Sequence, residues 1–345
     1  MADYPLISVV IPMRNEARSI GACLDSILAQ EYPRDRLEVI VVDGESDDDS
    51  LRVLAGYGAR IRVLNNPGRI VPTAMNIGIH AACGDVIARV DAHTILEPDY
   101  LKSGVDALGR SGADNVGGPM VSTGGGRQGD AIAAAMASRF GIGAYFHFGT
   151  DDRDVDTVYM GMYPRGVFER IGLFDEELVR NQDDELNYRL RKAGGRVFMT
   201  LRMRSRYQNR QSFKALAKQF FQYGEWKVRI LQKHPLQMSW RHFVPPALVV
   251  GFGGLLLLSP WWSVAALLLG LLVTLYGTAV IAATIATSRD RLELAPLVAL
   301  AFVIMHFSWG CGFLVGLVRF GRCWFGREPM PPRLAASSSA EISAE

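Results

Sequence analysis

An aspartate and a histidine follow a short apolar run in the segment Val86-Ile-Ala-Arg-Val-Asp-Ala-His93. The run Val86 to Val90 is typical of a buried strand. In an open parallel sheet, ligands bind beyond the carboxyl ends of the strands, and residues two apart at a strand end share a face. Asp91 and His93 can therefore meet a divalent cation or a ribose together. A strand-ending aspartate beside a surface histidine would give the same pattern, so other segments must decide between these interpretations.

Two further apolar runs, Leu6–Ile11 and Leu37–Val42, are also followed by residues that can bind a ligand. These residues are Pro12, Arg14, Asn15, Glu16 and Asp43. The carboxylates of Glu16 and Asp43 can accept hydrogen bonds from a nucleobase or from ribose hydroxyls, and Arg69 can neutralise a pyrophosphate. Each residue alone is better explained by a turn or a surface ion pair. Together, at successive strand ends, they favour a nucleotide site.

The elements that must position these residues alternate between strands and helices. Amphipathic helices are expected near Ala17–Gln30 and Pro72–Ala82, and a third short strand at Ile61–Leu64. This alternation predicts right-handed βαβ units, and therefore an α/β fold with a mostly parallel sheet flanked by helices. No glycine-rich dinucleotide motif follows the first strand and the sequence has no Walker loop, which argues against those two nucleotide-binding folds.

Charge and cysteine usage exclude some classes of function. The 345 residues carry a formal net charge of +2, and no basic run with interleaved aromatics covers the N-terminal half, so a nucleic-acid partner is not expected. The four cysteines have neither metal-ligand nor disulfide-framework spacing. Cys23 and Cys83 are expected to be buried, reduced thiols in helices, which favours a reducing, cytosolic environment.

Several motifs occur in an order and spacing typical of one enzyme family. They are Val9-Val-Ile-Pro-Met-Arg-Asn-Glu16, Val41-Val-Asp-Gly-Glu-Ser-Asp47, Asn76-Ile-Gly78, Val90-Asp-Ala-His93, Tyr159-Met-Gly-Met-Tyr-Pro-Arg165, Ile171-Gly-Leu-Phe-Asp-Glu176 and Asn181-Gln-Asp-Asp-Glu-Leu-Asn-Tyr-Arg189. Over residues 5 to about 230 the chain resembles a family-2 inverting glycosyltransferase of GT-A fold. Within that family it is most similar to the membrane-anchored glucosyltransferases of succinoglycan-type exopolysaccharide synthesis.

The resemblance implies a site for a nucleotide sugar and a divalent metal. The residues expected to bind the nucleotide sugar are Pro12, Arg14, Asn15, Glu16, Asp43, Arg69, Asn76 and Asp91. Asp43 matches the carboxylate that reads uracil, and Asp91 with His93 matches the Asp-x-Asp metal motif, in which His93 here replaces the second carboxylate. Imidazole suits Mn²⁺ better than Mg²⁺, which prefers oxygen. We therefore expect a divalent metal cofactor, with Mn²⁺ favoured over Mg²⁺.

The resemblance also implies a catalytic base. Where the family has a Glu-Asp pair before a helix, this chain has Gln182-Asp183. Asp183 is expected to deprotonate the acceptor hydroxyl, and Gln182 removes one source of the like-charge repulsion that would raise its pKa. Asp184 is the alternative base and is otherwise a carboxylate favoured at a helix N-terminus. Gly161 and Asp184 are assigned to the acceptor side.

A change in composition marks the expected domain boundaries. The expected organisation is a catalytic domain over residues 1–210, a basic interfacial helix region over 211–242, membrane helices over 243–320 and a partly disordered tail over 321–345. In the second region, a helix over Ser212–Gln232 combines lysines and arginines with aromatic residues, as in helices that lie on anionic membranes. Packing against the rest of the protein would explain about half of these aromatics.

Two apolar segments, Trp262–Ala286 and Ala295–Val318, are each long enough to cross a bilayer core of ~30 Å. Val244–Ser259 is shorter and is either a third span or a re-entrant segment. By the positive-inside rule, Arg319, Arg322 and Arg327 favour a cytosolic tail. With a cytosolic N-terminal domain this requires an even number of crossings. Either Val244–Ser259 does not cross fully, which gives two crossings, or there are three and the tail violates the rule.

The sequence therefore predicts a multi-pass enzyme of a bacterial-type inner membrane with a cytosolic catalytic domain. It would move one hexose, with glucose implied by the resemblance, from a UDP-sugar to a polyprenyl-linked glycan in exopolysaccharide biosynthesis. A glycolipid synthase with a diacylglycerol or ceramide acceptor is the alternative enzyme. An inactive nucleotide-sugar-binding scaffold is the alternative of another class.

Overall fold

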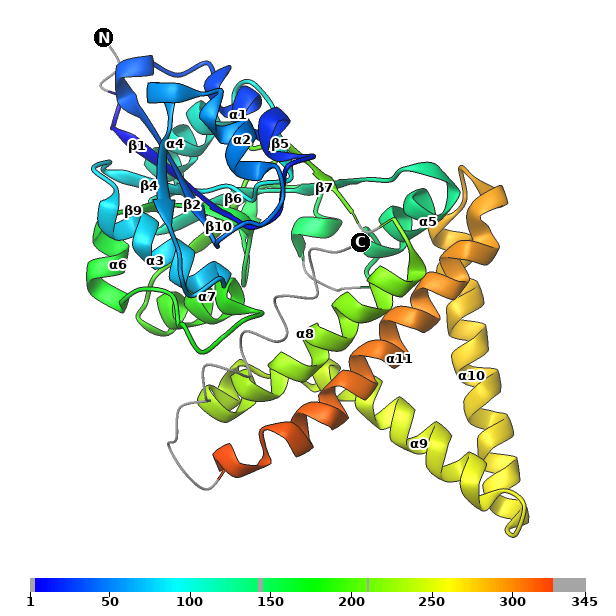
Figure 1. The fold of residues 1–345 in the computed structure, drawn as a ribbon. Coiled ribbons are helices and arrows are strands. Elements are labelled where there is room, and N and C mark those ends of the chain that lie inside the picture. Colours follow the sequence, from blue (N-terminus) through cyan, green and yellow to red (C-terminus); the bar gives the residue numbers. More distant parts are fainter. Residues whose placement is uncertain (1–3, 142–144, 210, 325–345) are drawn as a thin grey trace. The chain divides into compact units, whose positions relative to one another are not determined.

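The computed structural model describes residues 4–141, 145–209 and 211–324 (Figure 1). These residues form two compact units. The first contains residues 4–121 and 145–208, and the second contains residues 122–141, 209 and 211–324. The segment 122–141, which interrupts the first unit in sequence, thus belongs to the second. Arg327 and residues 325–345 of the expected tail lie outside the described residues, whereas residues 321–324 form a short 3-10 helix.

The first unit is built on an eight-stranded sheet in the order β3-β2-β1-β4-β9-β6-β10-β8. Its strands are β1 (Ile7–Met13), β2 (Leu37–Asp43), β3 (Arg62–Asn65), β4 (Val86–Arg89), β6 (Asn115–Gly118), β8 (Arg153–Asp154), β9 (Tyr159–Pro164) and β10 (Val197–Met199). Strands β1 to β4 pair in parallel, whereas β9 is antiparallel to β4 and to β6. This confirms the expected mixed, mostly parallel sheet, and it brings the carboxyl ends of β1, β2, β3 and β4 to one edge.

Helices cover this sheet and close its core. They are α1 (Ile20–Leu28), α2 (Ser50–Ala55), α3 (Val71–Ala81), α4 (Tyr100–Ser111), α6 (Gly166–Ile171) and α7 (Gln182–Lys192). Ile20, Leu24 and Ile27 of α1 are fully buried, because the apolar positions recur at helical spacing on one face. A Cβ on Gly78 would overlap the side chain of Val10, so α3 can approach β1 only with glycine there.

Two details differ from the sequence predictions. Strand β1 continues through Pro12 to Met13, although Pro12 was expected to end it. The ladder between β1 and β4 ends at Val10, so the missing N–H of Pro12 breaks no hydrogen bond on that side. Cys83 is exposed rather than buried, because α3 ends at Ala81 and Cys83 lies in the connection that follows.

A second, three-stranded sheet has the order β5-β11-β7, with β5 (Thr94–Leu96) antiparallel to β11 (Ser205–Gln208). The third strand, β7 (Met120–Thr123), leads into α5 (Gly126–Met136), and β11 leads into α8 (Phe213–Lys233). Both helices belong to the second unit. The chain therefore leaves the first unit twice from neighbouring strands of this small sheet.

The second unit consists of α5, α8 and three apolar helices, α9 (Val244–Leu258), α10 (Ser263–Thr287) and α11 (Ala295–Arg319). The three apolar helices have the length and composition of membrane spans. For α9 this holds when the preceding turn from Trp240 is included. Ser212 caps α8 by accepting a hydrogen bond from the N–H of Ala215 at 3.2 Å. Helix α8 lies along α11 (Figure 1).

Glycines allow α8 and α11 to approach closely. A Cβ on Gly312 of α11 would overlap the carbonyl oxygen of Phe221 in α8, and a Cβ on Gly224 of α8 would overlap the carbonyl oxygen of Trp309. Small residues at such positions let helix backbones come into van der Waals contact. Trp226 of α8 is fully buried in this contact, with its ring 5.3 Å from that of Phe320. The aromatic residues of α8 that were expected at a membrane surface are thus partly used for packing.

Replacing Gly312 by leucine is expected to separate α8 from α11 and to lower the free energy of unfolding by about 1–3 kcal/mol, the usual cost of overpacking. The measurement is the thermal transition of the detergent-solubilised protein. Gly253→Leu is the matched control, because a Cβ at Gly253 of α9 meets nothing within 4 Å. Equal transition temperatures for the two variants would contradict the close contact.

Candidate active site

A buried arginine joins the two carboxylates that were assigned to metal binding and to base catalysis. Arg89, at the end of β4, is 7% exposed. Its Nε donates to Oδ1 of Asp91 at 3.0 Å, and its Nη2 lies 2.9 Å from the same oxygen. Its Nη1 lies 3.8 Å from Oδ2 of Asp183, at the start of α7. The fold therefore brings Asp91 and Asp183, far apart in sequence, to one guanidinium.

This group contains more acidic than basic side chains, because two carboxylates face one guanidinium. Burial opposes the charge of Arg89, but Asp91 and Asp183 outweigh it and raise the pKa of the guanidinium, which stays protonated. Burial also raises the pKa of Asp183, Arg89 lowers it and Asp184 raises it, with a net shift upward. The side chain of Asp183 is nevertheless 35% exposed, so a substrate hydroxyl can reach it. A carboxylate with a raised pKa and access to solvent has the properties of a general base.

The backbone before α7 presents Asp183 to this group. Asn181 has a left-handed conformation with φ of 61°, and the helix begins at the next residue. Oδ1 of Asp183 accepts from the N–H of Asp184 at 2.9 Å, which leaves Oδ2 toward Arg89. The helix is fixed further along by Asn187, whose amide bonds both Asn115 and Thr157 at 2.8 Å.

His93 is oriented by Glu16. Nδ1 of His93 lies 3.0 Å from Oε1 of Glu16, and Oε2 of Glu16 accepts from the hydroxyl of Ser19 at 2.6 Å. Because an ionised carboxylate can only accept, Nδ1 is the donor in this bond, and in the neutral form of the ring Nε2 carries the lone pair. Histidines that bind metals usually donate their second N–H to a carboxylate in this way. Glu16 therefore orients the ring of His93 and leaves its Nε2 as the nitrogen that can bind a metal.

The donor set around Asp91 and His93 fits a divalent metal that is held partly by substrate. Among the described residues, no group of three or more histidine, cysteine or acidic side chains forms a closed metal site. Asp91 offers a carboxylate whose Oδ1 binds Arg89, and His93 offers Nε2. Sites with one or two protein ligands that use substrate phosphates and water as the others are common for such metals in phosphate chemistry.

The loops after β1 and β2 are hydrogen-bonded to each other. The N–H of Asn15 donates to the hydroxyl of Ser46 at 2.8 Å, and Oδ1 of Asn15 accepts from the N–H of Asp47 at 2.9 Å. Asp43 is 4% exposed and accepts from the N–H and the hydroxyl of Ser46 at 3.1 and 2.5 Å. Asn15 and Asp43 therefore fix the shape of this edge.

Left-handed backbone recurs in these loops. Asn15, Glu45 and Arg69 have φ of 55°, 56° and 57°. Such conformations cost free energy in residues other than glycine and cluster at functional sites. Nε of Arg69 donates to Oε2 of Glu45 at 2.6 Å. A Cβ on Gly44 would lie 3.3 Å from Cβ of Arg14 and 3.4 Å from Cα of Arg69, so the backbones of both arginines lie close to Gly44.

Other candidate residues have mainly structural contacts. The side chain of Asn76 in α3 donates to the carbonyl of Phe174 and to Glu176 at 2.9 and 2.8 Å, and it accepts from the N–H of Phe174. The structure does not bring Asn76 into the group around Arg89. Gly161 in β9 has φ of 109°, and a Cβ there would lie 2.6 Å from Oδ1 of Asn115. Both conditions require glycine.

Arg89 was not among the residues predicted from the sequence to have a role in the site. A signal was present, because a charged side chain inside the otherwise apolar run Val86 to Val90 must find a counter-charge when the strand is buried. Asp91, two residues on and on the same face, is one partner. The second partner, Asp183, comes from a distant segment, and spacing along the chain does not reveal it.

Replacing Arg89 by methionine is expected to lower the free energy of unfolding by about 3 kcal/mol, because both carboxylates lose their counter-charge in a buried site. Loss of the guanidinium also raises the pKa of Asp183 further, so the folded state binds that proton more tightly than the unfolded chain does. Stability then falls as pH rises, and the deficit should be larger near about pH 8 than near about pH 5.

Thermal unfolding at both pH values measures this effect. Arg89→Lys, which keeps the charge, is the control and should recover most of the difference. A deficit for Arg89→Met that is independent of pH would contradict the electrostatic role.

Comparison with known proteins agrees with this fold. Residues 8–172 match the family model described as "Glycosyl transferase family 2". The chain is 30% identical over 329 residues to "Succinoglycan biosynthesis protein ExoA" of Rhizobium meliloti (strain 1021), covering 91% of this chain and 96% of the relative. It is 27% identical over 328 residues to "Dolichyl N-acetyl-alpha-D-glucosaminyl phosphate 3-beta-D-2,3-diacetamido-2,3-dideoxy-beta-D-glucuronosyltransferase" of Methanococcus voltae, covering 91% of this chain and 97% of the relative.

Among solved structures, residues 1–349 of TarS from S. aureus align with a TM-score of 0.52 and 18% identity, covering 91% of each chain. The same protein in complex with UDP-GlcNAc aligns with a TM-score of 0.50 and 16% identity, covering 91% of this chain and 92% of that one. At this identity the likeness concerns the fold. Together with the coverage of the sequence relatives, these findings establish that the chain belongs to glycosyl transferase family 2.

Proposed function

We propose that this protein transfers a hexose, with glucose as the first candidate, from a UDP-sugar to a lipid-linked glycan with inversion at the anomeric carbon. The observation that carries the proposal is the convergence of Asp91 and Asp183 on Arg89. In this arrangement a group that binds the leaving diphosphate and a base that activates the acceptor belong to one site. Inversion requires these two functions on opposite faces of the sugar.

The donor half of the proposal rests on the edge formed by the loops after β1, β2 and β3. Asp43 and Asn15 shape this edge, and the backbones of Arg14 and Arg69 lie close to Gly44. Their guanidinium groups would supply the positive charge. Guanidinium groups favour phosphate, with which they form paired hydrogen bonds. The relative in fold that was solved with UDP-GlcNAc supports a uridine nucleotide as the donor.

Asp91 and Nε2 of His93 would hold the metal, and Glu16 keeps the imidazole in the required tautomer. When bound, a divalent cation neutralises the charge that develops on the departing diphosphate. Arg89 fixes the position of Oδ1 of Asp91 by a hydrogen bond. These contacts set the orientation of both protein ligands before a substrate arrives.

Asp183 would act on the acceptor. Its carboxylate takes the proton of the attacking hydroxyl while the acceptor oxygen forms a bond to the anomeric carbon. The bond from that carbon to the phosphate oxygen breaks, and its electron pair leaves with the nucleoside diphosphate. The raised pKa of Asp183 strengthens it as a base at neutral pH, since a carboxylate of ordinary pKa holds a proton too weakly.

A lipid-linked acceptor in exopolysaccharide synthesis is supported by two observations. The second unit contains apolar helices with the length and composition of membrane spans. The relatives carry the names of a succinoglycan biosynthesis protein and of a transferase acting on a dolichyl-linked phosphate sugar. A polyprenyl-linked glycan made on the cytosolic face of a bacterial inner membrane accounts for both.

Asp183→Asn is expected to reduce transfer by about 10²–10⁴-fold, the usual contribution of a general base, and to leave UDP affinity unchanged. The assay measures UDP release from a panel of UDP-sugars, with and without membrane extract, beside UDP binding by calorimetry. Asp184→Asn is the matched control and should stay active. Full turnover by Asp183→Asn with loss in Asp184→Asn would move the base to residue 184.

The same incubations test the class of protein and of acceptor. Release of UDP that depends on membrane extract would support the proposal that the protein is a transferase. Binding of UDP without its release from any UDP-sugar would support an inactive nucleotide-sugar-binding scaffold instead. Labelled lipid products that are cleaved by mild acid indicate polyprenyl pyrophosphates. Products stable to mild acid would instead indicate a diacylglycerol or ceramide acceptor.

His93→Asp is expected to change the metal preference. The wild-type protein should turn over faster with Mn²⁺ than with Mg²⁺, because an imidazole nitrogen favours the softer ion. The variant restores two carboxylates, which suit Mg²⁺, so the ratio of the Mn²⁺ rate to the Mg²⁺ rate should fall. Initial rates after removal of metal by a chelator and re-addition of each ion measure this ratio. Equal ratios for the two proteins would remove His93 from the ligand set.

A further inference from the structure

We propose that α11 does not cross the membrane, although it has the length and composition of a span, and that α9 and α10 form a hairpin that crosses twice. Both ends of α11 then lie on the membrane face that carries the first unit. The inference is independent of the reaction catalysed. It rests on the contacts of α11 with α5 and α8 within the second unit.

Helices α5 and α8 cannot lie across the membrane from the first unit. Strand β7 ends at Thr123 and α5 begins at Gly126, while β11 ends at Gln208 and α8 begins at Phe213. A connection of two to four residues spans at most about 15 Å, and a bilayer core is ~30 Å thick. Both helices therefore begin on the face where the first unit lies.

The residues just before α11 form an ion pair and a hydrogen bond with α5. Nη1 of Arg291, just before α11, lies 2.8 Å from Oδ2 of Asp130 in α5. Nη2 of Arg127 donates to the carbonyl oxygen of Glu293 at 3.1 Å. These charged contacts place residues 291–293 on the same face as α5.

The middle of α11 touches the same segment. The ring of Phe140, which follows α5, lies 5.1 Å from that of Phe302. Nε2 of His306 lies 2.8 Å from the carbonyl oxygen of Phe140, and Nδ1 of His306 lies 3.0 Å from the hydroxyl of Tyr276 in α10. A helix that spans the bilayer would have these residues at the depth of the hydrocarbon. Here Phe302 and His306 contact Phe140, which follows α5 and therefore lies on the face of the membrane where α5 begins.

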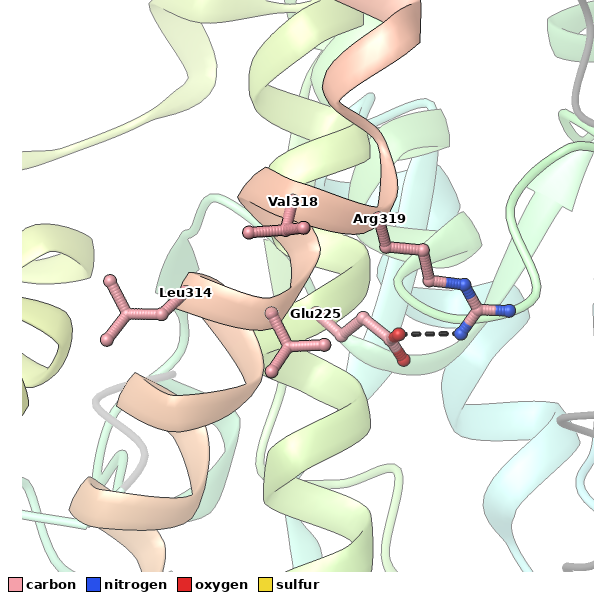
Figure 2. Close-up of a pocket in the computed structure, with 5 residues that line it drawn as sticks. Glu225, Leu314, Val318 and Arg319 are labelled. Atoms are coloured by element: carbon pink, nitrogen blue, oxygen red, sulfur yellow. Dashed lines mark hydrogen bonds and ion pairs between the residues drawn. The ribbon is translucent and has the colours of Figure 1, made fainter.

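The last part of α11 is fastened to α8. Nη1 of Arg319 lies 2.6 Å from Oε1 of Glu225, and Figure 2 shows this pair beside Leu314 and Val318. Nε2 of Gln232 donates to the carbonyl oxygen of Phe320 at 2.8 Å. From residue 291 to residue 320, α11 therefore contacts α5, its following turn or α8.

Helix α8 carries too much charge to follow α11 through hydrocarbon. Besides Glu225 it contains Lys214, Lys218, Lys227, Arg229 and Lys233. A charged residue at the centre of a bilayer costs about 2.5–3.5 kcal/mol even on insertion scales. Since α8 packs along α11, both helices must lie at the interface. Apolar residues exposed on α11, such as Leu300 (45% exposed), Val315 (44%) and Val318 (84%), would then face the lipid.

The hairpin of α9 and α10 has the features of a crossing element. Charged residues flank its base, at Arg241 and Arg289, whereas its tip from Ser259 to Trp262 has none. Trp261 and Trp262 at the tip are 80% and 51% exposed, and tryptophans favour the membrane–water interface. Helix α10, with 25 residues, is ~38 Å long. Two crossings return the chain to its starting face, which agrees with the positive charge after α11.

Labelling of single-cysteine variants of the full chain tests this topology. The probe is a membrane-impermeant polyethylene glycol maleimide, applied to spheroplasts and to inverted inner-membrane vesicles. Native Cys83 reports the face of the first unit. Asp290→Cys and Arg322→Cys report the two ends of α11, and Ser259→Cys reports the tip of the hairpin. In each variant the remaining cysteines are replaced by alanine, and labelling after denaturation defines the full signal.

Cys83 and the variants at 290 and 322 are expected to react from one face, and the variant at 259 from the other. Reaction of positions 290 and 322 from opposite faces would show that α11 crosses and would overturn the proposal. Failure of position 259 to react from the far face would overturn the crossing hairpin. Native Cys323, kept alone in a further variant, repeats the measurement at the end of α11 without a substitution there.

Discussion

The guanidinium of Arg89 lies between two carboxylates, and the geometry of the site depends on this contact. Asp91 approaches from the end of β4 and Asp183 from the start of α7, and without a cation between them their charges would repel. Burial of Arg89 makes its charge costly unless both partners are present. The same contact therefore stabilises the fold and holds the two carboxylates at one site. Two carboxylates beside one guanidinium leave an excess of negative charge, which favours a further cation at this site.

The loops after β1, β2 and β3 are held by contacts among their own residues. Asn15, Glu45 and Arg69 all have left-handed backbone, and each such residue must be held by its surroundings. Asn15 is held by Ser46 and Asp47, and Arg69 by Glu45. Side chains on loops fixed in this way keep their positions before a ligand binds. Less conformational entropy is then lost on binding, which favours a nucleotide with many polar groups.

The sequence predicted local features well because they have local causes. The buried strand before Asp91, the amphipathic face of α1 and the helix that starts near Ser212 follow from periodicity over a few residues. It missed features with distant causes. Arg89 has its role because it contacts Asp183, almost a hundred residues away in sequence. Glu16 orients His93, although the two residues follow different strands. The transfer of residues 122–141 to the second unit was equally hidden, because their partners on α11 lie beyond residue 290.

Hydropathy alone also fails to distinguish α11 from α10. Both helices have 25 residues and a strongly apolar composition. Only 11% of the best window of α10 is buried within the protein, but 39% of that of α11 is, and glycines bring α11 against the charged helix α8. An apolar side chain can be buried equally well in protein or in lipid. An apolar composition therefore shows that a helix is removed from water, but it does not show which of the two surrounds it. What distinguishes the two helices is their neighbours. Helix α11 contacts α9 and α10, but it also packs on α5 and α8, which begin within a few residues of the strands of the first unit.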